Sequence, residues 1–186
     1  MKKEIRILGI DDSPFDKFKD KEVLVIGAFY KGGIWLDGIL STKAKVDGSD
    51  STDKLLEMIN QSKFKAQIRA VLINGIAFGG FNVIDIVKLN KKTRIPIIVI
   101  IRKMPDIENI KKVLTKLGMK DKIRLIEKAG IPVKIGKIYC QFSGCSVNFV
   151  KEVLRISCTR SFIPEPIRIA HVIGAGIIDG ESHGDA

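Results

Sequence analysis

The first 46 residues alternate between apolar runs and short polar breaks, which is typical of consecutive β-strands. Strands are predicted over residues 5–10, 22–30 and 34–46, where Val, Ile and Leu recur. Lys31-Gly32-Gly33 separates the second strand from the third, and a Gly-Gly pair accepts the positive φ angles that hairpin turns need. The pattern therefore predicts a three-strand meander at the start of a sheet.

Beyond Val46 the apolar positions take up helical spacing and alternate with short strands. Helices are predicted to begin near Asp50, Val83, Pro105, Val147 and Pro164, and strands to cover residues 69–73, 95–101 and 135–142. This order predicts an α/β fold with a mixed sheet, and right-handed crossovers would place helices on both faces. No internal repeat and no Pro- or Ser-rich linker interrupts the chain, so we expect a single domain over residues 1–186.

The chain carries an excess of positive charge, with 32 Lys and Arg against 21 Asp and Glu and a formal net charge of +11. This excess is compatible with a polyanionic partner such as DNA. The alternative is compositional, because 24 of the 32 basic residues are Lys and Ile is also abundant. Genome composition or growth at high temperature can produce such a bias.

Features of membrane and secreted proteins are missing from the sequence. The longest apolar run, Ile95–Ile101, is much shorter than the ~20 residues of a membrane-spanning helix. Charged residues interrupt any apolar stretch near the N-terminus that would form a secretory signal. We therefore expect a cytoplasmic protein whose cysteines, Cys140, Cys145 and Cys158, are reduced thiols.

The histidines and cysteines form no recognisable zinc motif. His171 lies in an apolar helical segment, where we interpret it as a half-buried residue with its polar group satisfied. His183 lies in the polar tail that begins at Asp179, which we expect to be mobile. Cys140 and Cys145 lack a second Cys or His pair at zinc-binding spacing, so we expect no structural zinc site.

Two adjacent aspartates, Asp11 and Asp12, end the first predicted strand. Neighbouring residues on a strand point to opposite faces, so only one of the two can face a given cleft. Such a pair is suited to holding a metal ion at a strand end. The alternative is a turn or helix cap, because Asp-Ser-Pro is also typical of turns.

A second acidic cluster follows the third predicted strand, where Asp47, Asp50 and Asp53 fall within seven residues. Their oxygens are suitable ligands for a divalent cation, although the closing Glu of the calcium-binding loop is missing. The alternative is structural: Asp50 or Ser51 would cap the following helix, and Asp53 would complement its dipole.

A glycine-rich segment, Asn74-Gly75-Ile76-Ala77-Phe78-Gly79-Gly80-Phe81-Asn82, follows the fourth predicted strand. Its glycines would let the backbone approach a phosphodiester or an extruded base. The segment lacks the Gly-Lys-Ser/Thr ending of a P-loop and the three-glycine spacing of dinucleotide-binding loops, so we expect no nucleotide cofactor. A long turn without a binding role is the alternative.

Several of these motifs together resemble an archaeal family related to endonuclease V, known for nicking DNA at deoxyuridine. The resemblance covers nearly the whole chain, from Gly9–Phe15 through Asn74-Gly75 and Gly79–Asn82 to Ile163–His171. It implies a ribonuclease H-like fold. It also implies cleavage of a phosphodiester near a modified base by carboxylate-bound Mg²⁺, with oxygen ligands converging from separate strand ends.

Carried over residue by residue, the resemblance matches Asp11 to the aspartate of the family's Gly-Val-Asp motif, which implies that it is the main metal ligand. The glutamate after the third strand has no unambiguous match, and Asp47 or Asp50 would take its role. Asn74-Gly75 replaces an Asp-Gly pair, which should lower metal affinity because an amide carries no charge. Gly144-Cys145 stands where relatives have Gly-His.

Two further segments match the family more loosely. Trp35-Leu36-Asp37-Gly38 lies where relatives have an aromatic-x-Pro-Gly strip that separates the strands at the lesion. Trp35 would do so by stacking on a base, and an exposed strand aromatic is the alternative. Pro164-Glu165-Pro166 matches a segment that leads into the last helix, and we expect its role to be structural.

The sequence thus predicts a metal-dependent DNA endonuclease directed at deoxyuridine, with Mg²⁺ and alternatively Mn²⁺ as its cofactor. The candidate catalytic residues are Asp11, Asp12, Asp47 and Asp50, of which Asp11 and Asp47 are the candidate metal ligands. The candidate substrate-binding residues are Trp35, Asn74, Gly75, Gly79 and Gly80. A non-catalytic nucleic-acid-binding module on the same fold is the alternative, which Asn74 and Cys145 favour and the acidic cluster opposes.

Overall fold

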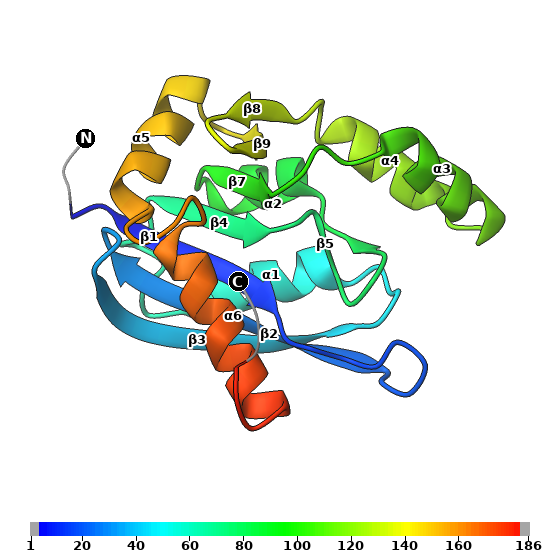
Figure 1. Cartoon of the computed structure of the whole chain (residues 1–186), viewed down its shortest axis with the longest axis horizontal. Helices are drawn as coiled ribbons and strands as arrows, with labels where there is room; N and C mark the ends of the chain where they lie inside the picture. The colour runs from blue at the N-terminus through cyan, green and yellow to red at the C-terminus, as the bar shows by residue number, and fades with distance from the viewer. Residues whose placement is uncertain (1–3, 183–186) are drawn as a thin grey trace.

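Seven strands form one mixed sheet in the order β3-β2-β1-β4-β7-β9-β8, and a two-stranded hairpin, β5-β6, lies outside it (Figure 1). The computed structural model describes residues 4–182. The strands are β1 (Arg6–Asp12), β2 (Glu22–Lys31), β3 (Trp35–Lys45), β4 (Ala70–Asn74), β5 (Ala77–Phe78), β6 (Asn82–Val83), β7 (Ile97–Ile101), β8 (Val133–Ile135) and β9 (Ile138–Ser143). The helices are α1 (Ser51–Gln61), α2 (Ile86–Thr93), α3 (Ile107–Lys116), α4 (Lys120–Lys128), α5 (Val147–Ser157) and α6 (Glu165–Ile178).

The predicted meander is confirmed, because β1 pairs antiparallel with β2 and β2 antiparallel with β3. The next two strands run parallel to β1: β4 pairs with β1, and β7 pairs with β4. Ile10 pairs with Ile73, so the following residues, Asp11 near the end of β1 and Asn74 at the end of β4, lie side by side. We call this end of the sheet, where β1, β4 and β7 finish, the carboxyl end, and the opposite end the amino end.

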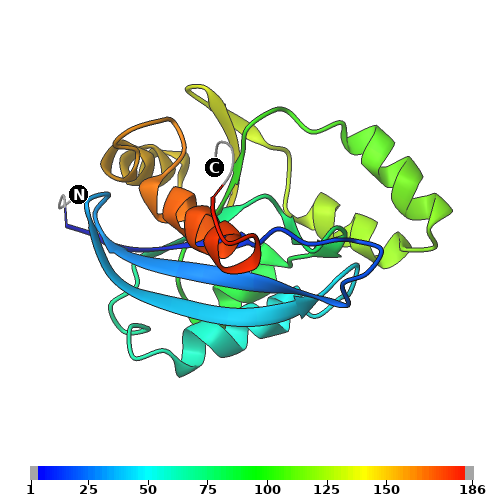
Figure 2. The same ribbon diagram turned by 60° about the horizontal axis from the view of Figure 1, so that its bottom comes forward.

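Helices cover both faces of the sheet, as predicted (Figures 1 and 2). On one face, α1 and α2 bury Leu55, Ile59 and Leu89 in a core with the apolar side chains of β1, β2, β4 and β7. On the other, α5 and the start of α6 bury Val150 and Ile167 against the same sheet. The α3–α4 pair forms a smaller apolar cluster beside the sheet. Among residues 4–182, no helix has the length and apolar character that a membrane span requires.

Some elements depart from the predicted pattern. The helix expected from Val83 begins at Ile86, because Oδ1 of Asp85 accepts a hydrogen bond from the backbone N–H of Lys88 and caps the helix there. The glycine-rich segment contains the β5-β6 hairpin. Helix α4 was not predicted because six of its nine residues are charged. α6 ends at Ile178, and His183 lies outside the described residues.

Candidate active site

Asp11 lies at the carboxyl end of the sheet, and only 3% of its surface is exposed. The side-chain Nδ2 of Asn74, the last residue of β4, donates to both carboxylate oxygens of Asp11 at 3.1 Å. Nδ1 of His171, on α6, lies 3.1 Å from Oδ2 of the same carboxylate. Three elements that are far apart in the sequence therefore meet at one buried carboxylate.

The contact with Asp11 changes the ionisation of His171. The hydrogen bond to Asp11 raises the pKa of His171, and partial burial of the imidazole opposes this rise. The carboxylate favours the proton on Nδ1, which fixes the orientation of the ring. The sequence predicts that His171 is half-buried and that its polar group has a hydrogen-bond partner. The half-burial is correct, but the partner lies 160 positions away and no local pattern indicated it.

Close packing of α6 on β1 brings His171 to Asp11. A Cβ atom on Gly9 would lie 2.3 Å from the carbonyl carbon of Pro166, so only glycine lets the start of α6 lie this close to the strand. Gly9 and Asp11 share a face of β1, and Pro166 and His171 lie on one helix. The Pro-Glu-Pro segment therefore has the structural role expected of it, since it seats α6 on the strand that carries Asp11.

Asp12 points to the opposite face of the sheet, as strand alternation predicts. Its Oδ2 accepts a hydrogen bond of 2.8 Å from the backbone N–H of Gly79. Burial raises the pKa of Asp12 to about 6, and the charge of Asp11 adds to this rise while the Gly79 N–H opposes it. A carboxyl group that titrates near neutral pH can exchange protons during a reaction.

Asp47 holds the turn between β5 and β6. Its Oδ1 accepts from the backbone N–H of Phe81 at 2.8 Å, and its own N–H donates to the carbonyl of Gly79 at 2.8 Å. Nζ of Lys122, a buried residue of α4, donates to the carbonyl of Asp47 at 2.7 Å. Burial lowers the pKa of Lys122. Asp47 is thus near Asp12 through Gly79, but its carboxylate is used in the loop.

Asp50 also has a structural environment. Its Oδ1 accepts from the backbone N–H of Lys45 at 3.1 Å and from Nδ2 of Asn82 at 2.6 Å. Asp50 occupies the N-cap position of α1 without a capping bond from its side chain, and Oδ1 of Asn82 accepts from the N–H of Ser51 instead. Within residues 4–182, no three His, Cys, Asp or Glu side chains form a group that could hold a metal ion.

The glycines of the candidate loop occupy two different settings. Gly75 continues the pairing of β4 with β7, because its N–H donates to the carbonyl of Ile100 at 2.9 Å. Gly79 and Gly80 form the β5-β6 turn with φ angles of 51° and 86°, which favour glycine. Gly79 is therefore the loop glycine whose backbone N–H contacts Asp12, the neighbour of Asp11.

Trp35 and Cys145 lie away from Asp11, at the amino end of the sheet. Asp11 pairs with Ile26 on β2, and Ile26 pairs with Ser41 on β3. Trp35 is six residues from Ser41 along β3, which is about 20 Å. Cys145 follows Ser143, which pairs with the first residue of β7. The histidine beside Asp11 is His171, and Cys145 lies at the opposite end of the sheet.

The cysteines are unsuited to nucleophilic chemistry. All three fall within the described residues and none forms a disulfide. Burial raises the pKa of Cys140 to about 12 and those of Cys145 and Cys158 to about 11. Since the thiolate is the reactive form, these side chains are inert at neutral pH.

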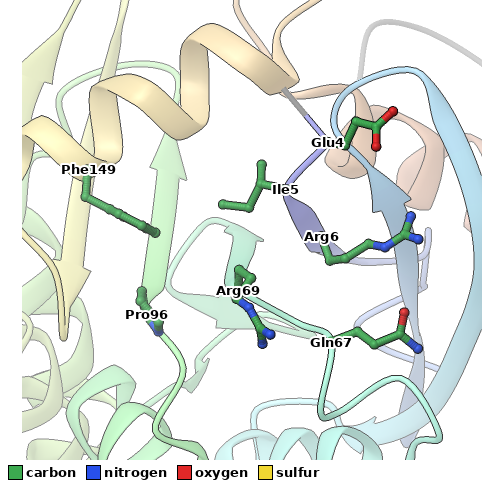
Figure 3. A pocket seen from close by; sticks show the side chains of 7 residues that line it. All are labelled: Glu4, Ile5, Arg6, Gln67, Arg69, Pro96 and Phe149. Carbon is green, nitrogen blue, oxygen red and sulfur yellow. The ribbon is translucent and has the colours of Figure 1, made fainter. Parts of the chain in front are cut away.

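A hollow of about 670 Å³ is also at the amino end (Figure 3). It lies where β1, β4 and β7 begin, and its lining includes Arg6, Arg69, Pro96 and Phe149. The Arg6 guanidinium forms an ion pair with Asp37, and Arg69 donates to the carbonyl of Ala66 at 2.9 Å. These cations are thus engaged in local structure, and the hollow is remote from Asp11.

Comparison with known sequences connects the chain to one family. The family model described as endonuclease dU matches residues 3–178. A UPF0215 protein from Methanothermobacter thermautotrophicus is 46% identical over 191 aligned positions, which cover 100% of this chain and 94% of that protein. One from Pyrococcus horikoshii is 38% identical and covers 100% of this chain and 98% of that protein.

Comparison with solved structures supports the same conclusion. A protein of unknown function from Archaeoglobus fulgidus has a TM-score of 0.87 and 36% identity, covering 97% of this chain and 99% of that one. Human ENDOV has a TM-score of 0.58 and 17% identity, covering 89% of this chain and 81% of that one. Endonuclease V from Ciona intestinalis, in complex with inosine-containing DNA, has a TM-score of 0.56 and 16% identity, covering 89% of this chain and 82% of that one. The chain has the ribonuclease H-like fold that endonuclease V shares, and it belongs to the endonuclease dU family.

Proposed function

We propose that this protein is a metal-dependent DNA endonuclease that nicks DNA at or near deoxyuridine. The observation that carries the proposal is the buried carboxylate of Asp11, held by Asn74 and His171 at the carboxyl end of the sheet. Membership of the endonuclease dU family supports the substrate, and the net charge of +11 supports a polyanionic partner.

The donor set around Asp11 fits Mg²⁺ or Mn²⁺. Asp11 supplies carboxylate oxygens, and the side chain of Asn74 carries an amide oxygen, all of which are hard ligands. Asp12 faces the other side of the sheet, but the charge of Asp11 raises its pKa, so a cation bound at Asp11 would relieve part of that repulsion. Asp47 and Asp50 are assigned to the loop in this proposal, since Oδ1 of each already accepts a hydrogen bond from a loop group.

Asp11, His171 and Asn74 would each have a separate role in the reaction. Asp11 orients the imidazole of His171 through Nδ1, which leaves Nε2 to exchange a proton with an oxygen of the phosphodiester. Asn74 orients the Asp11 carboxylate through two hydrogen bonds. A divalent cation, when bound, supplies Lewis-acid stabilisation of the charge that develops on the phosphoryl oxygens.

A second candidate function is a nucleic-acid-binding module without cleavage. Two observations favour it: the uncharged Asn74 beside Asp11, and the lack of a third acidic or histidine ligand among the described residues. Both candidates predict binding to DNA, and only the first predicts strand breaks.

A nicking assay separates the two functions. Duplexes with one deoxyuridine, one hypoxanthine or only normal bases are incubated with the parent protein in Mg²⁺, in Mn²⁺ and in EDTA. We expect single-strand breaks in the deoxyuridine duplex with either metal and none in EDTA. Breaks in EDTA would contradict the metal requirement, and binding without breaks would favour the second function.

A further inference from the structure

A second hollow, of about 500 Å³, opens at the carboxyl end of the sheet. Arg102 and Lys103 line it from the segment after β7, and Lys137 from the turn between β8 and β9. Phe162 lines it from the loop before α6, and Arg168 from the first turns of that helix. We call this hollow the basic pocket.

The basic pocket has a one-sided charge. Among the described residues that line it, four are Lys or Arg and none is Asp or Glu. Arg168 is neutralised in part, because it donates to both carboxylate oxygens of Glu165 at 2.6 and 2.9 Å. Lys103 and Lys137 add two further positive charges to the described wall, so the pocket favours an anionic ligand.

An aromatic ring lies among these cations. Phe162 is 52% exposed, and Nζ of Lys137 lies 4.6 Å from the centroid of its ring. The flanking Ile163 is buried, and its N–H donates to Oγ of Ser161 at 3.1 Å, which orders the loop. An exposed ring beside a row of cations is the combination that proteins use to stack a base and to hold its phosphate.

The basic pocket is next to the Asp11 site. β4 lies between β1 and β7, so two strand spacings, or about 10 Å, separate β1 from β7. Arg102, which lines the pocket, follows two residues after Ile100, the residue of β7 that pairs with Asn74. Arg168 and His171 are three residues apart on α6 and share a helix face. At about 3.4 Å per nucleotide along a duplex strand, a strand cut at Asp11 reaches the pocket within about three nucleotides.

We propose that the basic pocket is a nucleotide subsite, in which Lys103 and Lys137 hold a phosphodiester of the cut strand and Phe162 stacks on an unpaired base. The proposal rests on the proposed function of the Asp11 site. Every base presents a π-face, so the subsite tolerates any sequence and requires only that the base be out of the duplex stack.

Binding measurements test the subsite without cleavage. Fluorescence anisotropy in EDTA gives the Kd for a duplex with one deoxyuridine and a short unpaired flank. Phe162→Ala and Phe162→Leu should each weaken binding about 5- to 100-fold, since stacking contributes ~1–3 kcal/mol per base. Lys137→Gln should reduce the slope of log affinity against log salt by about 0.7 to 0.9. The Leu variant guards against a folding defect in the Ala variant.

The chain offers a control for each variant at the amino end of the sheet. Ile34 is an exposed apolar residue at 73%, and Lys63 lies over the ring of Phe64 at 5.2 Å as Lys137 lies over Phe162. Ile34→Ala and Lys63→Gln should leave Kd within about twofold of the parent. Equal losses for Phe162→Ala and Ile34→Ala would contradict the subsite, because they would indicate nonspecific contact.

The position of the stacked base gives an independent measurement. 2-Aminopurine placed at successive unpaired positions loses fluorescence when it stacks. We expect quenching at one position within three nucleotides of the deoxyuridine, and its loss in Phe162→Leu. If the parent nicks DNA while Phe162→Leu binds and quenches normally, the subsite is wrong and the proposed function stands. If the parent binds and quenches but does not nick, the cleavage is wrong and the subsite stands. No binding by the parent overturns both.

Discussion

The two ends of the central sheet carry different chemistry, although each has a hollow lined by arginines. At the amino end, Arg6 and Arg69 bond to protein groups, and the hollow of Figure 3 lies beside no buried carboxylate pair. At the carboxyl end, Asp11 and Asn74 meet beside the smaller basic pocket. The larger of these two hollows is therefore remote from Asp11, and the candidate site is marked by the carboxylates at the strand ends.

Topology explains this difference. The carboxyl ends of β1, β4 and β7 meet at one end of the sheet, and the segments that follow them bring Asp12, Gly79 and Arg102 there. In open α/β sheets, ligands bind outside the carboxyl ends of the strands for this reason. At the amino end the chain enters the strands from connecting segments, and polar side chains there bond to neighbouring protein groups.

The largest expected effect is on catalysis at the carboxyl end. Asp11→Asn removes a charged ligand while keeping the shape of the side chain, so nicking of a deoxyuridine duplex should fall by about 10²- to 10³-fold, equivalent to several kcal/mol. Ile34→Ala, at the amino end, should leave the nicking rate within about twofold. Rates are measured under single-turnover conditions. Comparable losses in both variants would remove the distinction between the two ends.

The next effect concerns the packing that brings α6 to β1. Gly9→Ala would place a Cβ 2.3 Å from the backbone of Pro166, so we expect a loss of about 2–3 kcal/mol in the free energy of unfolding. This corresponds to a fall of about 6 °C in Tm for a chain of this size.

The matched control for Gly9→Ala lies on α6, the helix that packs against Gly9. No atom lies within 4 Å of a Cβ built on Gly176, so Gly176→Ala should raise stability by about 0.5–1 kcal/mol. Thermal unfolding followed by circular dichroism measures both variants. An unchanged Tm for Gly9→Ala would mean that α6 can shift away from the strand, and that His171 is not held in place by this contact.

The sequence was sufficient for the meander, the mixed sheet and the position of Asp11, because each leaves a local signal: strand alternation, a Gly-Gly turn, or acids at a strand end. It was insufficient for His171, whose partner is 160 positions away and becomes a neighbour only when α6 packs on Gly9. It also could not show the structural contacts of Asp47 and Asp50. Oδ1 of Asp47 accepts from the N–H of Phe81, and Oδ1 of Asp50 accepts from Nδ2 of Asn82, and neither contact leaves a local signal in the sequence.

A smaller effect is expected from the ion pair that holds Arg168 at the basic pocket. The hydrogen bond from Arg168 lowers the pKa of Glu165 below its usual 4.5, so the folded protein binds this proton less readily than the unfolded chain does. The stabilisation is therefore present above about pH 4.5 and is lost as pH falls through the lower, folded-state pKa.

Urea unfolding between pH 3 and pH 6 (~0.5-unit steps) measures this dependence. Glu165→Gln should cost on the order of 1 kcal/mol at pH 6 and make the profile flatter in acid, because the neutral amide cannot titrate. A Glu152→Gln variant, in an exposed pair with Arg155 on α5, should change the profile much less. If the free energy of unfolding of Glu165→Gln fell with pH in the same way as the parent's does, the loss of stability in acid would come from other carboxylates.

The smallest effect is expected at Asp47, and it decides which acids of the carboxyl end act on DNA. Asp47 has a positive φ of 52°, which Asn tolerates well, and an Asn side chain still offers an oxygen to the N–H of Phe81. If the Asp47 carboxylate serves only the β5-β6 turn, Asp47→Asn should keep the Tm within about 2 °C and the nicking rate within about threefold. The Mg²⁺ concentration for half-maximal nicking should also stay unchanged, since no ligand charge at the metal is lost. A Mg²⁺ requirement raised about tenfold would restore Asp47 as a ligand and enlarge the site across both faces of β1.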